Sequence, residues 1–351
     1  MQNLLLARPL QRHFPGKSIV IVLDSSKHLA HTRTLTTTTT ITTTIHRPIP
    51  AASGRSRVLR SKVSGRLLGA VAAVSAVTMS DKLCPANPSE VMVIRNVTPN
   101  VVTFSVPFLR FGRIPIGGRG TLVRLTSGSL AIFSPVALTP EAKEAVSALG
   151  GAVKYIVALD REHHLFVSEW KAAYPDAAVI GPEGLPEKRL GQDDARVGPD
   201  TFDLVFTKAG KRDVRVGPDF DADFAYEYVD AHPNGELVFC FRRDGGVLIQ
   251  ADYLFNLPAR EQYSRVPEAQ RPRPGVLARL FLGLNSIEGE AKGIKRLLWY
   301  AFSRADRPSW NDSAKRIHAW TFQTIVPCHG DVIEGNGKEV FEKVFEWHLK
   351  A

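Results

Sequence analysis

From about residue 90 onward, the apolar residues of this chain fall into two groups of strand-like runs, and helical segments follow each group. The first group includes the β-branched segments 91–108 and 120–136, where Ser-Gly-Ser marks a tight turn. The second group spans residues 224–256 and is divided by turns at 233–235 and 244–246. Strands in two groups, each covered by helices, predict an α/β domain over residues 90–351 with the architecture of an αββα sandwich.

The helical signals support this assignment. Thr139 suits an N-cap, Pro140 the first helical position and Gly150 a helix end, so a helix is expected between them. An apolar strand at 153–159 then precedes a further helix and strand, as in a βαβ unit. The polar, basic segment 258–322 is predicted to be a helical insert. The glycine-rich stretch 112–121 lacks the Lys-Ser/Thr ending of a phosphate loop and is expected to form a hairpin loop.

Residues 1–79 have a different composition. They carry eleven basic residues and one acidic residue, and ten threonines lie between Thr32 and Thr44. Such a segment cannot bury enough apolar surface to offset its ordering entropy, so it is predicted to be disordered. Its Arg-rich and Ser/Thr-rich character is typical of a transit peptide and indicates a mitochondrial location, whereas a functional start at Met79 indicates a cytoplasmic one. The apolar run 67–79 is too short to span a bilayer, so no integral membrane segment is expected.

The charge distribution limits the partners of the folded part. The formal net charge of +10 arises entirely within residues 1–79, and acidic and basic residues balance in the remainder. A neutral domain has no long-range field that attracts a polyanion, so a nucleic-acid partner is not expected. A small-molecule substrate is the expected partner instead.

Four histidines and one aspartate share a position that often carries function. Each follows an apolar strand at a junction between strand and loop, where a rigid scaffold displays functional groups. These residues are His163, His164, His232, Asp252 and His329. Imidazole and carboxylate groups are ligands of zinc and iron, so the pattern indicates a metal site. The alternative is a hydrogen-bonded cluster without metal. His348, on the closing amphipathic helix, is expected at the surface.

The order of these motifs resembles that of the metallo-β-lactamase superfamily, over about residues 92–347. The superfamily carries His-x-His-x-Asp-His after one strand, then a later His, an Asp in a GDxLF-like strand end, and a final His in PGHG. Here ADYLF (251–255) and PCHG (327–330) match the later motifs. His232, Asp252 and His329 fall on the last three ligand positions.

The chain departs from the superfamily pattern at its first motif, ALDREHH (158–164). Leu159 and Arg161 occupy the first two histidine positions, and neither side chain can donate a lone pair to a metal. The resemblance therefore implies loss of the first metal site, of which only His232 remains. It implies a second site in which His163, His164, Asp252 and His329 hold one Zn²⁺ or Fe²⁺ ion.

The resemblance implies a mononuclear hydrolase that acts on an ester, thioester or phosphoester. Asp252 and Arg161 are the expected catalytic residues, with Arg161 free to bind an anionic group of the substrate. Asp160 or Glu162 is expected to accept the N–H of a ligand imidazole. The alternative function is that of a non-catalytic pseudoenzyme, a binding or scaffold protein of the same fold that uses the helical insert 258–322 as its contact surface.

Overall fold

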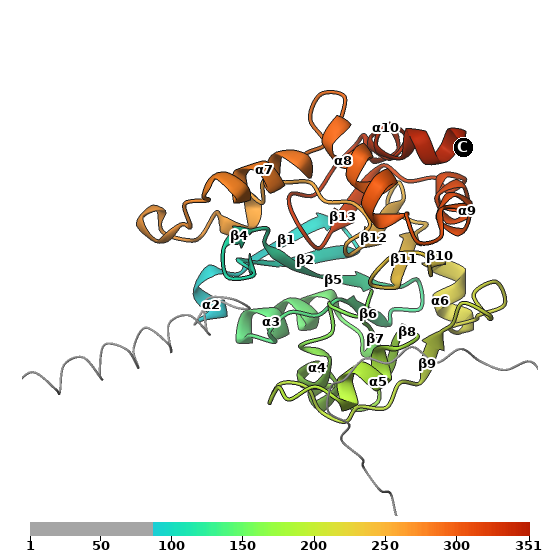
Figure 1. Cartoon of the computed structure of the whole chain (residues 1–351). Coiled ribbons are helices and arrows are strands. Elements are labelled where there is room, and N and C mark those ends of the chain that lie inside the picture. The colour runs from blue at the N-terminus through green and yellow to red at the C-terminus, as the bar shows by residue number, and fades with distance from the viewer. Residues whose placement is uncertain (1–86) are drawn as a thin grey trace, which may run out of the picture. The chain divides into compact units, whose positions relative to one another are not determined.

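The computed structural model describes residues 87–351, in which two β-sheets lie face to face and helices cover both outer sides (Figure 1). The predicted αββα sandwich is therefore confirmed. The segment 1–79, with the expected disorder and transit function, lies outside the described residues. No helix among the described residues is both long and apolar enough to cross a membrane.

The first sheet has seven strands, antiparallel from β1 to β6 and parallel from β6 to β9. In spatial order they are β1 (Val93–Thr98), β2 (Val101–Val106), β5 (Gly118–Arg124), β6 (Leu130–Phe133), β7 (Val153–Val157), β8 (Ala178–Pro182) and β9 (Leu204–Phe206). β5 and β6 form the expected hairpin. The glycine-rich stretch forms the turn between two short strands, β3 (Leu109–Arg110) and β4 (Ile114–Pro115), and then enters β5.

The second sheet has four strands. They are β10 (Phe224–Val229), β11 (Glu236–Phe241), β12 (Val247–Gln250) and β13 (Thr324–Pro327). The first three are antiparallel, with turns where the sequence predicts them, whereas β12 and β13 run parallel. Because β12 and β13 run parallel, they end at the same edge of the sheet, although the helical insert separates them in the chain.

Three apolar layers hold these elements together. Phe133, Phe224 and Phe239 pack between the two sheets, with ring centroids 5.1–6.2 Å apart. Alternate residues of a strand reach different layers: Val123 of β5 faces the second sheet, and Leu122 faces the helices outside. Both faces of the strands are therefore buried, which explains why they read as nearly continuous apolar runs.

The helices complete the outer layers. Those on the side of the first sheet are α3 (Pro140–Leu149), α4 (Val167–Ala173) and α5 (Leu185–Leu190). Those on the side of the second sheet are α8 (Lys292–Leu297), α9 (Arg307–His318) and α10 (Gly337–Lys350). As predicted, α3 begins at Pro140 and Thr139 caps it through a hydrogen bond from the Ala142 amide.

The remaining helical elements are short or lie apart from these layers. They are α2 (Pro88–Val91), α6 (Pro218–Asp223), the 3₁₀ turns Glu261–Tyr263 and Glu268–Gln270, α7 (Val276–Leu284), and a π-helical turn at Leu298–Phe302. The predicted insert 258–322 is thus helical, although Leu254–Pro274 is largely loop.

Candidate metal centre

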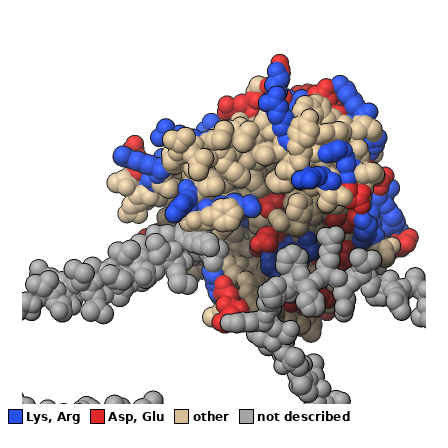
Figure 2. Space-filling model, viewed as in Figure 1, with Lys and Arg blue, Asp and Glu red and all other residues tan. Residues whose placement is uncertain are grey.

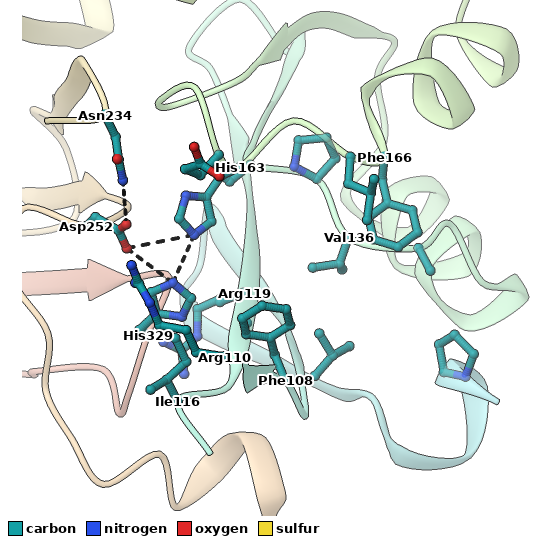
Figure 3. Close-up of a pocket in the computed structure, with 18 of the residues that line it drawn as sticks. Phe108, Arg110, Ile116, Arg119, Val136, His163, Phe166, Asn234, Asp252 and His329 are labelled. Carbon is teal, nitrogen blue, oxygen red and sulfur yellow. Dashed lines mark hydrogen bonds and ion pairs between the residues drawn. The ribbon is translucent and has the colours of Figure 1, made fainter. Parts of the chain in front are cut away.

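The register of two parallel strands brings Asp252 and His329 together. Gln250 of β12 pairs with Pro327 of β13, and each of the two functional residues follows its strand by two positions. His163 reaches the same place from the loop after β7. Three potential ligand atoms thereby meet, with every pair within 4.8 Å: the Nε2 atoms of His163 and His329 and the Oδ1 atom of Asp252 (Figure 3).

Hydrogen bonds orient both imidazoles. His329 Nδ1 lies 2.6 Å from the carbonyl oxygen of Gly117, and His163 Nδ1 lies 2.9 Å from Asp160 Oδ1. A carbonyl or carboxylate oxygen can only accept, so each Nδ1 carries the proton and each Nε2 directs its lone pair into the site. The sequence offered Asp160 and Glu162 as acceptors for a ligand imidazole, and in the structure Asp160 takes this role.

Asp252 is held in a similar way. Its Oδ2 atom accepts a hydrogen bond from Asn234 Nδ2 at 2.8 Å, and its backbone amide donates to Glu236 at 3.1 Å. Its Oδ1 atom is buried and accepts no hydrogen bond from the described residues, although it lies 3.2 Å from His329 Nε2. One carboxylate oxygen thus faces the two imidazole lone pairs without a donor.

This donor set fits a divalent transition-metal ion. Zinc at about 2.0–2.2 Å from tetrahedral ligands requires ligand atoms roughly 3.3–3.6 Å apart. The two Nε2 atoms are 3.0 Å apart, and Asp252 Oδ1 lies 3.2 Å from His329 Nε2 and 3.9 Å from His163 Nε2. Each separation lies about 0.1–0.3 Å outside that range, so small side-chain shifts would place all three atoms around one ion. Two imidazoles and one carboxylate also match the ligands that zinc and iron prefer, and three protein ligands leave a position open.

If no metal ion is bound, a proton has to lie between the Nε2 atoms of His163 and His329, because two lone pairs 3.0 Å apart repel each other. Burial opposes the charged form of His163, but the carboxylates of Asp160 and Asp252 outweigh it and raise the pKa of His163 to about 10. Burial would raise the pKa of Asp252, whereas His163 and His329 hold it well below its usual range. The site therefore favours a positive charge beside Asp252, as either a proton or a cation.

His164 is turned away from this group. Its Nδ1 atom lies 3.0 Å from Arg189 Nη1, which also donates to its carbonyl oxygen at 2.8 Å. A guanidinium can only donate, so Nδ1 accepts, Nε2 carries the proton, and neither nitrogen has a lone pair for a metal. Burial and the charge of Arg189 lower the pKa of His164 to about 4. Contrary to the sequence-based expectation, the structure does not bring His164 into the site.

His232 also lies outside the group of three. Its Nδ1 atom accepts a hydrogen bond from the Asn234 amide at 3.2 Å, and its ring centroid lies 5.5 Å from that of Trp310 in α9. Burial lowers the pKa of His232. A protonated ring would be costly in these apolar surroundings, so His232 is neutral and packs beneath the helices.

Arg161 does not line the pocket that opens beside the three ligand atoms. Its guanidinium donates to the carbonyl oxygens of Pro233 and Asn234, at 2.6 and 3.2 Å, and so ties two loops together. Glu162 forms an ion pair with Lys188 at 2.7 Å. Leu159 is buried between the sheets, as an apolar residue at this position should be. The anion-binding geometry expected for Arg161 is therefore not observed.

Three residues that the sequence did not indicate complete the site. Asn234 bridges Asp252 and Asp160, and the Gly117 carbonyl orients His329. Glu236 accepts the amides of Ala251 and Asp252 at 2.5 and 3.1 Å. Burial and the nearby carboxylates raise the pKa of Glu236 well above its usual value. The only sequence signal for Glu236 is a charged residue that opens an otherwise apolar strand.

A pocket of about 510 Å³ opens beside the three ligand atoms. His163, Asp252 and His329 form one wall, and Figure 3 shows apolar side chains on the opposite side. The apolar lining residues include Val106, Phe108, Phe111, Ile116, Val136 and Phe166. Arg110 also lines the pocket, from the β3–β4 hairpin.

Comparison with protein families gives one match. Residues 111–184 match the family described as a domain of unknown function, DUF4336. This segment includes β5 to β8 and the loop that carries His163. No curated protein matches the chain.

Solved structures similar to this chain include metallo-β-lactamases and flavodiiron proteins. A metallo-β-lactamase from Pontibacter korlensis has 11% identity, and the match covers 74% of this chain and 100% of that chain, with a TM-score of 0.43. The Flv1 flavodiiron core from Synechocystis sp. PCC6803 has 12% identity, covers 73% of this chain and 60% of that chain, and has a TM-score of 0.47. A flavo di-iron protein from Thermotoga maritima has 12% identity, 73% and 62% coverage, and a TM-score of 0.45.

Proposed function

We propose that this protein is a metallo-β-lactamase-like hydrolase that uses one Zn²⁺ or Fe²⁺ ion, held by His163, Asp252 and His329. The observation that carries the proposal is the convergence of two imidazole lone pairs and one donor-free carboxylate oxygen on the wall of a pocket. His164 and His232 are not included, because in each ring Nδ1 accepts a hydrogen bond and the proton is on Nε2, and neither ring belongs to the group of three.

The substrate is an ester, thioester or phosphoester with a bulky apolar group. The pocket beside the candidate ligands is lined mainly by apolar side chains, which favour an acyl or aryl group and exclude water. Arg110, at the pocket wall, takes the role of binding an anionic group that the sequence suggested for Arg161. An ion held by these three residues would supply Lewis acidity and a nucleophile near neutral pH.

The surrounding residues hold the ligands ready for this chemistry. Asp160 and the Gly117 carbonyl keep the protons of His163 and His329 on Nδ1, so that both Nε2 atoms stay available. Asn234 occupies one oxygen of Asp252 and leaves the other facing the site. Preorganisation of this kind reduces the reorganisation needed when substrate binds.

Metal analysis of the purified full-length chain, after growth with zinc or iron under reducing conditions, tests the ligand set. We expect about one ion per chain, and its loss in His163→Ala, Asp252→Ala and His329→Ala. His318→Ala, which changes a histidine on the surface of α9, is the matched control and should retain the ion. His164→Gln should also retain it, which separates this ligand set from the one implied by the resemblance. Absence of metal in the unaltered chain would refute the proposal.

Activity is measured on aryl and acyl esters, thioesters and a phosphodiester. We expect kcat/KM for the best substrate to fall at least about a hundredfold in His329→Ala relative to His318→Ala. Equal activity of the two variants would show that this site does not carry the reaction.

A second candidate function is that of a non-catalytic binding protein. The observation that favours it is that a protonated His163 can donate to both Asp160 and His329 without an ion, which leaves only Asp252 Oδ1 without a donor among these groups. A folded protein that takes up neither zinc nor iron in the metal analysis would support this function instead.

A further inference from the structure

Helix α7 carries apolar side chains on the side that faces away from the protein. Val276 and Leu277 are each 81% exposed, and Leu280 is 59% exposed. These residues follow the i, i+1, i+4 spacing of a single helical face. On the opposite side, Ala278 is buried and Leu282 packs against the apolar cluster around Leu257. The helix is therefore apolar on both sides, although only one is covered by the described part of the chain.

The β3–β4 hairpin lies beside this helix and extends the exposed apolar surface. Phe281 of α7 and Ile114 of β4 belong to one apolar cluster, so the two elements are in contact. Phe111, at the tip of the hairpin, is 68% exposed and adopts a positive φ of 53°. A large aromatic residue rarely occupies this conformation, so the turn presents Phe111 to solvent at a conformational cost.

The charged residues of both elements have one sign. The hairpin contributes Arg110 and Arg113, and residues 273–287, which include α7, contribute Arg273 and Arg279. No acidic residue occurs between residues 107 and 118 or between 269 and 287. Figure 2 shows an uncharged surface over α7, with Lys and Arg side chains beside it and Asp or Glu side chains at its upper edge and left end. We call these four arginines, together with Phe111, Val276, Leu277 and Leu280, the α7 surface.

We propose that the α7 surface binds the interface of an anionic lipid bilayer. A helix with exposed apolar side chains and flanking basic residues inserts its apolar face at the level of the lipid headgroups, and its arginines attract anionic lipids. Helix α7 lies in the plane of the interface and does not span it, because it has only nine residues.

Two other occupants agree less well with the charges. In a symmetric pair of chains, the α7 surface would meet its own copy and bring like arginines together. Residues 8–66 of this chain carry eleven basic residues and one acidic residue, so this stretch is repelled by the α7 surface as well. Anionic lipid supplies the opposite charge and the apolar environment together.

The proposal also gives the pocket an orientation. Arg110 and Phe111 belong to the α7 surface and also line the pocket, so the pocket opens beside the part of the protein that meets the membrane. A substrate with an acyl group can then pass from the bilayer into the apolar pocket. Membrane binding itself does not depend on the proposed hydrolase function.

Co-sedimentation of the full-length chain with vesicles tests the proposal. Vesicles of phosphatidylcholine with 30% phosphatidylglycerol should bind the protein, and added salt should weaken binding. The double variant Leu277→Asp/Leu280→Asp should lower the partition coefficient about tenfold or more, because it removes apolar area and adds negative charge. Leu190→Asp is the matched control. Leu190 is 78% exposed on α5, on the outer side of the first sheet, and this variant should bind vesicles as the unaltered chain does.

The control also accounts for the basic N-terminal segment, which is present in every variant. Equal binding by the double variant and Leu190→Asp would overturn the proposal, since any membrane affinity would then arise elsewhere. A concentration-dependent dimer that only the double variant abolishes would show that a second copy covers the α7 surface, and would overturn it too.

A probe at the helix gives a local measurement. A polarity-sensitive fluorophore on Leu277→Cys, with Cys84→Ser to remove a competing thiol, should shift to the blue when anionic vesicles are added. The same fluorophore on Leu190→Cys should not shift. Emission that is already blue-shifted without vesicles would mean that the chain or its partner covers α7, which contradicts the proposal. The measurement needs no substrate and no metal, so its outcome is independent of the hydrolase assay.

Discussion

Gly330 shows how one backbone position controls the geometry of the site. It follows His329 directly, has a φ of 90°, and its amide donates to Gln262 Oε1 at 3.0 Å. A Cβ atom at this position would lie 1.9 Å from the carbonyl oxygen of Asn256. Because a backbone atom cannot move aside as a side chain can, only glycine fits here, and this explains the Gly of the PCHG motif.

Gly330→Ala is therefore expected to destabilise the protein by about 3 kcal/mol, through both the positive φ and the clash. Gly128→Ala is the matched control, because Gly128 has a φ of 85° but open space around its Cβ position. The control should cost only about 1 kcal/mol. Urea unfolding at neutral pH measures both values, and similar losses would mean that the close approach to Asn256 contributes nothing.

Arg119 connects elements that are distant in the chain. It lies on β5 with its side chain buried, and it donates to the carbonyl oxygens of Pro327 and Gly330 at 2.6 and 2.7 Å. It also pairs with Glu261, in the first turn of the insert, at 3.2 Å. Through this one guanidinium, the first sheet supports the loop that carries His329.

Arg119→Met is expected to cost about 3–5 kcal/mol, because it leaves buried carbonyl groups and Glu261 without their partner. Arg124→Met, at the exposed end of the same strand, should change the free energy of unfolding by less than about 0.5 kcal/mol. If the first variant were as stable as the second, the guanidinium would not support the His329 loop. Denaturant titration of both proteins provides the comparison.

The stability of the whole molecule should depend on pH through His348. Against the sequence-based expectation of a surface position, the structure buries this residue, with its Nδ1 2.7 Å from Asn311 Oδ1 and its ring against Trp299. The expectation was wrong because α10 packs on α9 as well as on the sheet, which leaves little of it exposed. Burial, with the charge of Arg307, lowers the pKa of His348 to about 4.

The unfolded chain binds a proton at His348 below pH 6.5, whereas the folded chain does so only near pH 4. Stability should therefore fall as the pH falls from about 6.5 to 4, by about 1.4 kcal/mol per pH unit from this residue at most. His348→Gln should be less stable at pH 7 and lose less on acidification, whereas the exposed His318→Gln should retain the full slope. Unfolding at pH 7, 5.5 and 4.5 distinguishes them, and parallel curves for all three proteins would contradict the assignment.

Most of the fold could be predicted because it depends on local patterns. Thr139 and Pro140 start a helix by capping chemistry, and the strands are recognisable because both of their faces are buried. The candidate site was predictable in part for the same reason: Asp252 and His329 end neighbouring strands, so a correct sheet places them together. The roles of Gly117, Asn234 and Glu236 were not predictable, since their partners come from distant loops.

His163 and His164 mark the limit of what the sequence alone could decide. They are adjacent and chemically identical, and the resemblance assigned both of them to the metal site. The structure separates them by their partners: Asp160 directs His163 toward His329, whereas Arg189 holds His164 outside the site. Residues next to each other point in different directions, and the charge that each one meets depends on packing between distant elements. The strand ends and their donor types followed from the sequence, but only the tertiary structure selected the nitrogen atoms that face Asp252.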